Sequence, residues 1–172
     1  MRILTFTILF SLLFACEQKQ TSTETEIQIS SQATQDSIIE RYLKQGAWKH
    51  GLYSIEYRDA IDEGLAADTT VAYLWQQRAM PLFKQGKYEL GMSYLDRAVA
   101  IQPDRWQDYR AFIKCIFAKT YRAAIEDFQD CKAKFGNNYV MDHSYNFYIA
   151  LCHLQLNEFQ KAEQILKSEI EQ

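Results

Sequence analysis

Asp142, His143 and Ser144 carry the three side-chain types of a hydrolase triad in consecutive positions. In a triad, a carboxylate orients a histidine that takes the proton of the nucleophile, and the three groups come from separate elements of the fold. Because neighbours in sequence rarely present three side chains to one point, we expect no catalytic site here. The simpler interpretation is that Asp142 or Ser144 caps a helix that begins at this place.

Metal and cofactor chemistry has no better support. The histidines His50, His143 and His153 are not spaced as metal ligands, such as a pair four residues apart on a helix. The sequence contains no GxGxxG segment and no Walker-type phosphate loop. We therefore predict a non-enzymatic protein that holds no metal and no cofactor.

Cys16 stands where a covalent modification would occur. Residues 1–15 combine a positive charge at Arg2 with an apolar run that is shorter than the about 20 residues of a membrane span but has the size of a secretory signal peptide. The run ends in Leu13-Phe14-Ala15-Cys16, which resembles the bacterial lipobox, although Phe14 is bulkier than the usual residue. The resemblance implies cleavage of residues 1–15 and lipidation of Cys16. The alternative is a plain signal peptide with a chance cysteine.

Residues 16–36 contain no aromatic residue and are rich in Gln, Ser, Thr and Glu. Such a segment buries too little apolar surface to order itself, so we expect a flexible tether that spans roughly 25 Å as a random coil. Residues 37–172 would form the folded domain, held at a bacterial envelope membrane by the lipid on Cys16. Glu17 is compatible with sorting to the outer membrane, on its periplasmic or its surface face.

The composition indicates a helical domain with aromatic cores. The chain is 48% hydrophobic and 14% aromatic, and its 6 Gly and 2 Pro are few for a turn-rich β fold of 172 residues. The formal net charge is -3. A mildly acidic chain is poorly suited to bind nucleic acid, so we expect no nucleic-acid partner.

The most regular stretch runs from Ala72 to Pro103. Trp75, Ala79 and Leu82 lie four and three residues apart, which places them on one face of a helix. A second series follows a turn at 85–87, so the two helices should fold back antiparallel. The pair keeps apolar surface and needs neighbouring pairs to cover it. The second series consists of Tyr88, Gly91, Leu95 and Ala98.

This spacing resembles the tetratricopeptide repeat (TPR), which alternates large apolar, small and aromatic residues in two helices and closes with Pro. Arg78 departs from the pattern, and Pro81 lies inside the first helix, where it should bend it. The resemblance implies an all-α fold, namely a right-handed superhelix of antiparallel helix pairs. The residues that match are Trp75, Ala79, Leu82, Gly86, Tyr88, Gly91, Leu95, Ala98 and Pro103.

Three clear repeats and a degenerate leading one are predicted. Tyr109 and Ile116 follow Trp75 and Leu82 by 34 residues and Tyr121 follows Tyr88 by 33, as if one residue were deleted from the turn near 119–120. We expect Asp104 to cap this second repeat. The third repeat comes after a longer loop at 137–143, with helices at 144–156 and 158–170. Helix-like runs at 38–45 and 51–67 form the leading repeat.

Cys115, Cys131 and Cys152 remain when Cys16 is lipidated, and an odd number argues against a complete disulfide framework. Cys131 occupies a place where the repeat prefers Ala, so we expect a small buried side chain there. A bridge between Cys115 and Cys131 is the alternative.

The resemblance also implies a concave surface lined by the first helix of each pair. Aromatic and Met side chains with two cations, Arg110 and Lys114, suit an extended or helical peptide of acidic character. Ordinary packing is the alternative interpretation for Phe117 and Leu151. The predicted groove consists of Gln76, Met80, Phe83, Arg110, Lys114, Phe117, Phe147 and Leu151.

The function that fits these features is a non-catalytic, membrane-tethered scaffold that binds another envelope protein or a peptide segment of one. The runner-up is an accessory lipoprotein that binds a small ligand or a glycan. That alternative requires aromatic platforms open to solvent, and Trp48 and Trp106 are the candidates.

Replacement of the modified residue tests the anchor. We expect Cys16→Ser to move the protein from the membrane fraction to the soluble fraction after signal cleavage, because the lipid chains are what holds it. The measurement is fractionation followed by mass spectrometry of the amino terminus. Cys115→Ser is the matched control and should stay in the membrane fraction. Retention of Cys16→Ser in the membrane fraction would contradict lipid attachment.

Overall fold

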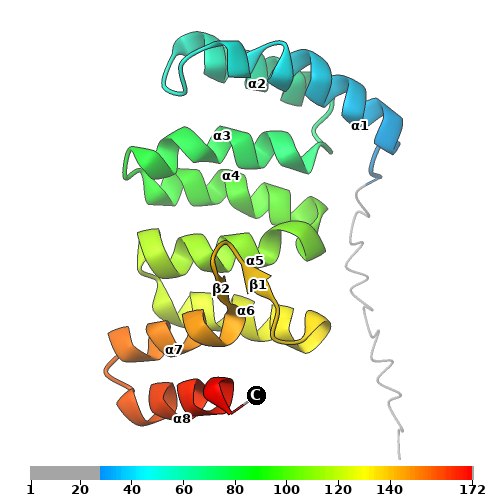
Figure 1. The fold of residues 1–172 in the computed structure, drawn as a ribbon. Helices are drawn as coiled ribbons and strands as arrows, with labels where there is room; N and C mark the ends of the chain where they lie inside the picture. Colours follow the sequence, from blue (N-terminus) through cyan, green and yellow to red (C-terminus); the bar gives the residue numbers. More distant parts are fainter. Residues whose placement is uncertain (1–27, 172) are drawn as a thin grey trace, which may run out of the picture.

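The computed structural model describes residues 28–171 of the chain. The predicted signal peptide, Cys16 and the predicted tether up to residue 27 lie outside the described residues. Helices are stacked in layers along one axis, which confirms the predicted all-α class (Figure 1). The α-helices are α1 (Gln32–Ile38), α2 (Ile55–Ala67), α3 (Ala72–Lys84), α4 (Tyr88–Ile101), α5 (Pro103–Ile113), α6 (Tyr121–Phe135), α7 (Tyr145–Gln155) and α8 (Phe159–Ile170).

Three shorter helical segments extend or connect these helices. A π-helical segment η1 (Ile39–Lys44) continues α1, the 3-10 segment η2 (Ala47–Lys49) follows it, and a second π-helical segment η3 (Lys114–Ala118) continues α5. The helices form four consecutive pairs, in which α1 with η1 packs on α2, α3 on α4, α5 on α6 and α7 on α8. Each pair then packs on the next (Figure 1).

The turns inside the last three pairs share one backbone device. Gly86, Lys119 and Asn157 each have a positive φ, of 73°, 56° and 60°. Each stands two residues before the aromatic that begins the second helix of its pair. A left-handed residue ends a helix and lets the chain reverse. The turn between the two helices of the first pair has no such left-handed residue at Gly46, whose φ is -105°. The first pair is therefore built differently.

The amino-terminal end of the fold corrects the predicted tether. Helix α1 begins at Gln32, inside the range 16–36, and Ser31 caps it by accepting a hydrogen bond from the N–H of Thr34. The backbone N–H of Ser30 donates to the hydroxyl of Thr70 at 3.1 Å. Gln35 is buried and its amide donates to the carbonyl of Ser30. Polar contacts that the apolar pattern does not reveal therefore order this segment.

Three buried clusters follow one another along the stack. The first joins η1, α2 and α3, the second joins α3, α4 and α5, and the third joins α5, α6 and α7. Ala79, Leu95 and Ala98 are fully buried, as the spacing predicted, and Phe128 is too. Trp75 packs against two clusters and its indole N–H donates to the carbonyl of Thr69 at 2.8 Å. The predicted core faces are therefore confirmed.

Helix α5 differs from its prediction at both ends. It begins at Pro103 with Gln102 as the cap residue, so Asp104 lies in the first turn and is not the cap. The π-helical turn of η3 rotates the helix face, so that Cys115 is buried while Ile116 is 39% exposed. Ile116 is therefore not the structural equivalent of Leu82, which is buried.

The long loop between α6 and α7 forms a hairpin of two short strands, which the predicted all-α fold did not include. Strands β1 (Tyr139–Val140) and β2 (His143–Ser144) pair antiparallel, with Tyr139 opposite Ser144. Glu169 of α8 accepts hydrogen bonds from Asn137, Ser144 and Asn146. Burial raises the pKa of Glu169, but these hydrogen bonds outweigh it and hold the pKa below its usual value. The carboxylate thus fixes the base of the hairpin.

A close contact between α3 and α4 provides a test of the packing. Gly91 of α4 faces Phe83 of α3, and a Cβ on Gly91 would lie 2.5 Å from Cε1 of that buried ring. We expect Gly91→Ala to lower the free energy of unfolding by about 1–3 kcal/mol, since overpacking a closed core costs that much. The measurement is urea denaturation followed by circular dichroism.

Gly51→Ala is the matched control, because a Cβ there meets no atom within 4 Å. It should change the free energy of unfolding by no more than about 0.5 kcal/mol. Equal stability of the two variants would show that Phe83 does not close over Gly91.

Candidate functional site

The residues with triad chemistry do not converge. Ser144 accepts a hydrogen bond from the N–H of Phe147 and so caps α7, as expected. Asp142 and His143 are exposed, and the His143 ring lies 4.0 Å from the ring of Phe147. Within residues 28–171, no three His, Cys, Asp or Glu side chains are grouped as metal ligands.

The three described cysteines are buried and free. Cys131 is 1% exposed, which confirms its predicted place in the core, and burial raises its pKa to about 12. The thiol next to Cys115 is that of Cys152 and not that of Cys131, and their hydrogen bond lowers the pKa of Cys115. The alternative bridge between Cys115 and Cys131 is therefore absent in this structure.

The two cations of the predicted groove are already paired. Asp127, only 5% exposed, accepts from Nη2 of Arg110 at 2.6 Å and from Nζ of Lys114 at 2.7 Å. Arg110 also reaches Asp96 at 2.9 Å. Burial lowers the pKa of Arg110, but the bonds to Asp127 outweigh it and leave the pKa raised. Because two carboxylates neutralise these cations, they offer little to an acidic peptide.

The other predicted groove residues differ in their exposure. Phe83 and Gln76 are 4% and 6% exposed, and Phe83 belongs to the core between α3 and α4. Phe117 is 39% exposed on η3. Phe147 and Leu151 are half-buried against the third cluster, which agrees with ordinary packing for Leu151. Only Gln76 and Met80 lie next to the cavity described below, where the hydroxyl of Tyr109 donates to Sδ of Met80 at 3.0 Å.

The structure instead places a cavity between α3, α5 and the hairpin. It has a volume of about 370 Å³, and the hairpin lies in front of α5 in Figure 1. Tyr139 and Met141 of the hairpin are 65% and 59% exposed, while Val140 between them is buried. We call the surface around this cavity the hairpin face. It is lined by Tyr73, Gln76, Gln77, Arg105, Trp106, Asp108, Tyr109, Tyr139, Val140 and Met141.

A chain of side-chain amides runs along the hairpin face. Oε1 of Gln77 accepts from the indole N–H of Trp48 and from the hydroxyl of Tyr57, each at 3.2 Å. The amide of Gln77 donates to Gln76 at 2.8 Å. Gln76 in turn hydrogen-bonds Tyr109, which partly opposes the effect of burial that raises the pKa of Tyr109. The amides are therefore held in fixed orientations.

A second cavity of about 290 Å³ adjoins the first on the side of α1. Tyr73, Arg105 and Trp106 line both cavities. The ring of Tyr73 stacks on Trp106 with centroids 5.8 Å apart, and the Arg105 guanidinium lies 4.4 Å from the centre of the Trp106 ring. We call this second space the α1 cavity. Its other residues are Gln32, Gln35, Ile39 and Gln102.

Trp106 is not an open platform. The residue is 5% exposed, so it offers no flat ring to solvent. Its indole N–H is buried and has no hydrogen-bond partner among the described residues. Trp48 is 50% exposed but its N–H is bound by Gln77. The sequence suggested both tryptophans as platforms, and only Trp48 has the exposure that this requires.

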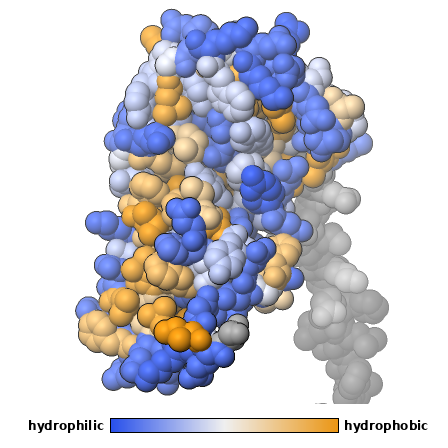
Figure 2. Space-filling view, in the orientation of Figure 1, coloured by the Kyte–Doolittle hydropathy of each residue, from blue (hydrophilic) through white to orange (hydrophobic). Residues whose placement is uncertain are grey.

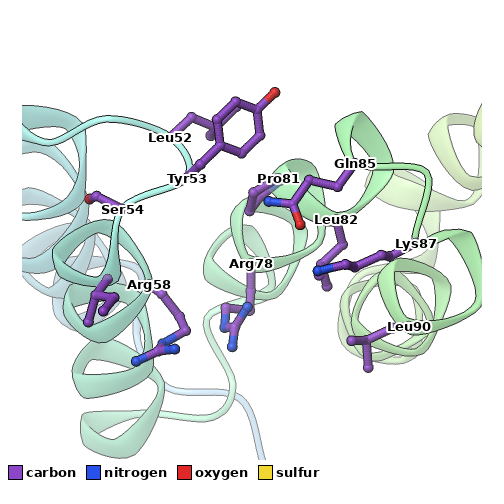
Figure 3. A pocket seen from close by; sticks show the side chains of 11 residues that line it. Leu52, Tyr53, Ser54, Arg58, Arg78, Pro81, Leu82, Gln85, Lys87 and Leu90 are labelled. Carbon is purple, nitrogen blue, oxygen red and sulfur yellow. The ribbon is translucent and has the colours of Figure 1, made fainter.

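Two further cavities lie at other places on the stack. Figure 3 shows one of about 250 Å³ at the edge between α2 and α3, with the basic side chains of Arg58, Arg78 and Lys87 around it. Arg58 and Arg78 are paired with Asp59 and Asp62 at 2.6 Å and 2.7 Å. Another of about 540 Å³ lies between α4 and the start of α6 and is mostly apolar.

Apolar side chains also gather on the surface. Figure 2 shows them mainly over the half of the molecule that holds α5 to α7, whereas the end with α1 and α2 is mostly hydrophilic. Phe117 and Leu154, each 39% exposed, belong to this half.

Comparison with known proteins adds no relative. The chain matches no protein-family model and no curated protein. In the part of the chain that the structure describes, no helix has the length and apolar character needed to cross a bilayer.

The sequence did not indicate that the hairpin residues lie next to Arg105 and Trp106 of α5 around one cavity. The signal that was available is Tyr139-Val140-Met141, three apolar residues within the long loop at 137–143. Exposed aromatic and Met side chains in a loop often contribute to binding.

The ion pairs around Asp127 yield a stability prediction. We expect Asp127→Asn to lower the free energy of unfolding by about 1.5–3 kcal/mol, since charged hydrogen bonds to Arg110 and Lys114 are lost. Asp96→Asn is the control, because its carboxylate is 51% exposed and, among the described residues, pairs with Arg110 alone. It should cost less than about 1 kcal/mol. The measurement is thermal and urea denaturation of both variants. Similar effects would contradict the central place of Asp127.

Proposed function

We propose that this chain is a non-catalytic TPR-type scaffold of the bacterial cell envelope. The chain is tethered through a lipid on Cys16 to a membrane, the outer membrane in our proposal, and its stacked pairs bind another envelope protein. The fold proposed is the right-handed TPR superhelix. The single observation that carries the binding role is the hairpin face, a hollow between α3 and α5 with an exposed apolar rim.

The repeated turns support the TPR assignment. The left-handed residues Gly86, Lys119 and Asn157 recur at offsets of 33 and 38 residues, the same offsets that relate Tyr88, Tyr121 and Phe159. Helix pairs with a common turn and successive packing are what a repeat architecture requires.

The chemistry of the hairpin face favours an extended peptide segment. Gln76 and Gln77 line the cavity, and their amide oxygens already accept hydrogen bonds within the protein. Each amide NH2 group carries two hydrogens, of which Gln77 uses one for Gln76, so donors remain for a peptide carbonyl. Tyr139 and Met141 offer exposed apolar contact beside them. Binding sites for peptides commonly combine main-chain hydrogen bonds with such pockets.

Small-ligand or glycan binding remains the second candidate. The observation that favours it is Trp48, whose half-exposed ring stands beside Gln77. A sugar ring would pack on the indole while its hydroxyls exchanged hydrogen bonds with the amide. Binding of a protein segment and binding of a sugar are separable in one experiment.

The test uses variants on the exposed rim. We expect Tyr139→Ser/Met141→Ser to lose the principal partner in crosslinking from membranes of the source organism, because both side chains stand at the mouth of the cavity. The control is Phe159→Ser, a change of an equally exposed apolar residue on α8, which should retain the partner. Helicity by circular dichroism should be unchanged in all variants.

Equal recovery of the partner by the rim variant and the control would refute binding at the hairpin face. If the wild type binds an oligosaccharide array but recovers no protein partner, and the rim variant loses the binding to the array, the second candidate is supported instead.

A further inference from the structure

We propose that the α1 cavity holds a carboxylate of the bound peptide, clamped by Arg105 and the indole N–H of Trp106. The inference rests on the proposed function and deepens it, because it names the group by which the partner is anchored. The ligand is an acidic segment that enters the α1 cavity with one carboxylate and continues over the hairpin face.

The first argument is the unmet donor. The indole nitrogen of Trp106 is buried without an acceptor among residues 28–171. A buried donor that forms no hydrogen bond costs about 1–3 kcal/mol. Trp48 and Trp75, by comparison, donate to Gln77 and to the carbonyl of Thr69. The nitrogen is closed to water in this structure, so an acceptor oxygen from a ligand would recover the cost once a side chain in the shared wall of the two cavities moves aside.

The second argument is the unused charge. Arg105 takes part in none of the ion pairs found among the described residues. Its guanidinium is held 4.4 Å from the centre of the Trp106 ring by a cation–π contact. Arg110 and Lys114, in contrast, are neutralised by Asp127. The guanidinium over the face of the indole and the N–H at its edge are two kinds of donor that one anionic group can approach.

The third argument is the character of the cavity wall. No Asp or Glu lines the α1 cavity, whose polar residues are Arg105 and three glutamines. Asp36 accepts a hydrogen bond from the side-chain amide of Gln32 at 2.8 Å but does not line the cavity, and Asp108 lines the other cavity and accepts from the hydroxyl of Tyr145 at 3.0 Å. An anion that binds in the α1 cavity therefore meets a cation and amides, and it meets no like charge in the wall.

The helix next to the cavity strengthens the preference for an anion. Helix α5 begins at Pro103, and Gln102 provides no side-chain cap. The amino-terminal end of a helix carries a partial positive charge. Gln102 itself lines the cavity, and its side-chain amide is a third donor. Asp104 in the first turn is turned to Lys134, with 3.9 Å between the charged atoms.

The volume indicates a side chain or a peptide end as the group inserted. About 290 Å³ is at the lower limit of small-molecule pockets. The shared wall of Tyr73 and Trp106 leads to the neighbouring cavity of about 370 Å³. A peptide can therefore place an acidic residue in the α1 cavity and a further residue beneath Tyr139.

Nuclear magnetic resonance of the tryptophan side chains tests the proposal in the full chain. The chain has 3 Trp, so ¹⁵N-Trp labelling gives three indole signals, and Trp106→Phe assigns the one of interest while it preserves the ring. The probe is the peptide acetyl-Tyr-Glu-Ala-Glu-Tyr-amide, compared with the same peptide carrying Gln in place of Glu. Glutarate and maltohexaose are the other two probes.

We expect the Glu peptide to shift the Trp106 indole signal downfield in a saturable way, as a new hydrogen bond to a carboxylate requires. Arg105→Gln should weaken this binding at least about tenfold, since the loss of a charged hydrogen bond has that effect. Arg97→Gln, an exposed Arg on α4 that lines none of the cavities described above, is the matched control and should bind as the wild type does.

Three results would overturn the proposal. They are an unchanged Trp106 signal at saturating peptide, equal binding of the Gln peptide or of maltohexaose, and equal binding by Arg105→Gln. Glutarate that binds as tightly as the Glu peptide would overturn the peptide as the source of the carboxylate. If the rim variant loses its partner while the Trp106 signal never responds, only the carboxylate clamp fails and the proposed function stands.

Discussion

The apolar surface that no single helix pair can bury is the constraint on which this structure depends. Each pair closes around small residues, such as Gly91 beneath Phe83. The outer sides of the pair stay apolar and have to be covered by the next pair. The three successive core clusters are the result, and Tyr109 and Phe112 join the second cluster to the third. Stability therefore extends along the stack from one pair to the next.

Charge at the helix contacts is mostly satisfied inside the protein. Asp127 is buried and would be costly without Arg110 and Lys114, since an unpaired buried carboxylate loses its hydration. The same pairing withdraws these two cations from any partner. Arg105 forms no ion pair with a carboxylate of residues 28–171, and its position over Trp106 is what distinguishes the α1 cavity from the paired basic residues near α2 (Figure 3).

The hairpin changes a helix surface into the wall of a cavity. Without it, Tyr73, Gln76 and Tyr109 would form part of an open surface on α3 and α5. Strands β1 and β2 provide the third wall, and Glu169 holds their base to α8. The hairpin is tolerated because it lies in a loop between two helix pairs, where extra residues leave the packing of the helices unchanged.

The sequence by itself determined the paired helices, their turns and their buried faces. These features follow from local periodicity and from the conformational limits of the backbone, and the faces that include Ala79, Leu95 and Ala98 are buried as predicted. The tertiary structure alone decided the site. Asp127 reaches Arg110 from another helix, and Tyr139 comes to Tyr73 from a loop far along the chain. Side-chain charge pairing and cavity walls depend on such distant neighbours, which a helical repeat pattern does not encode.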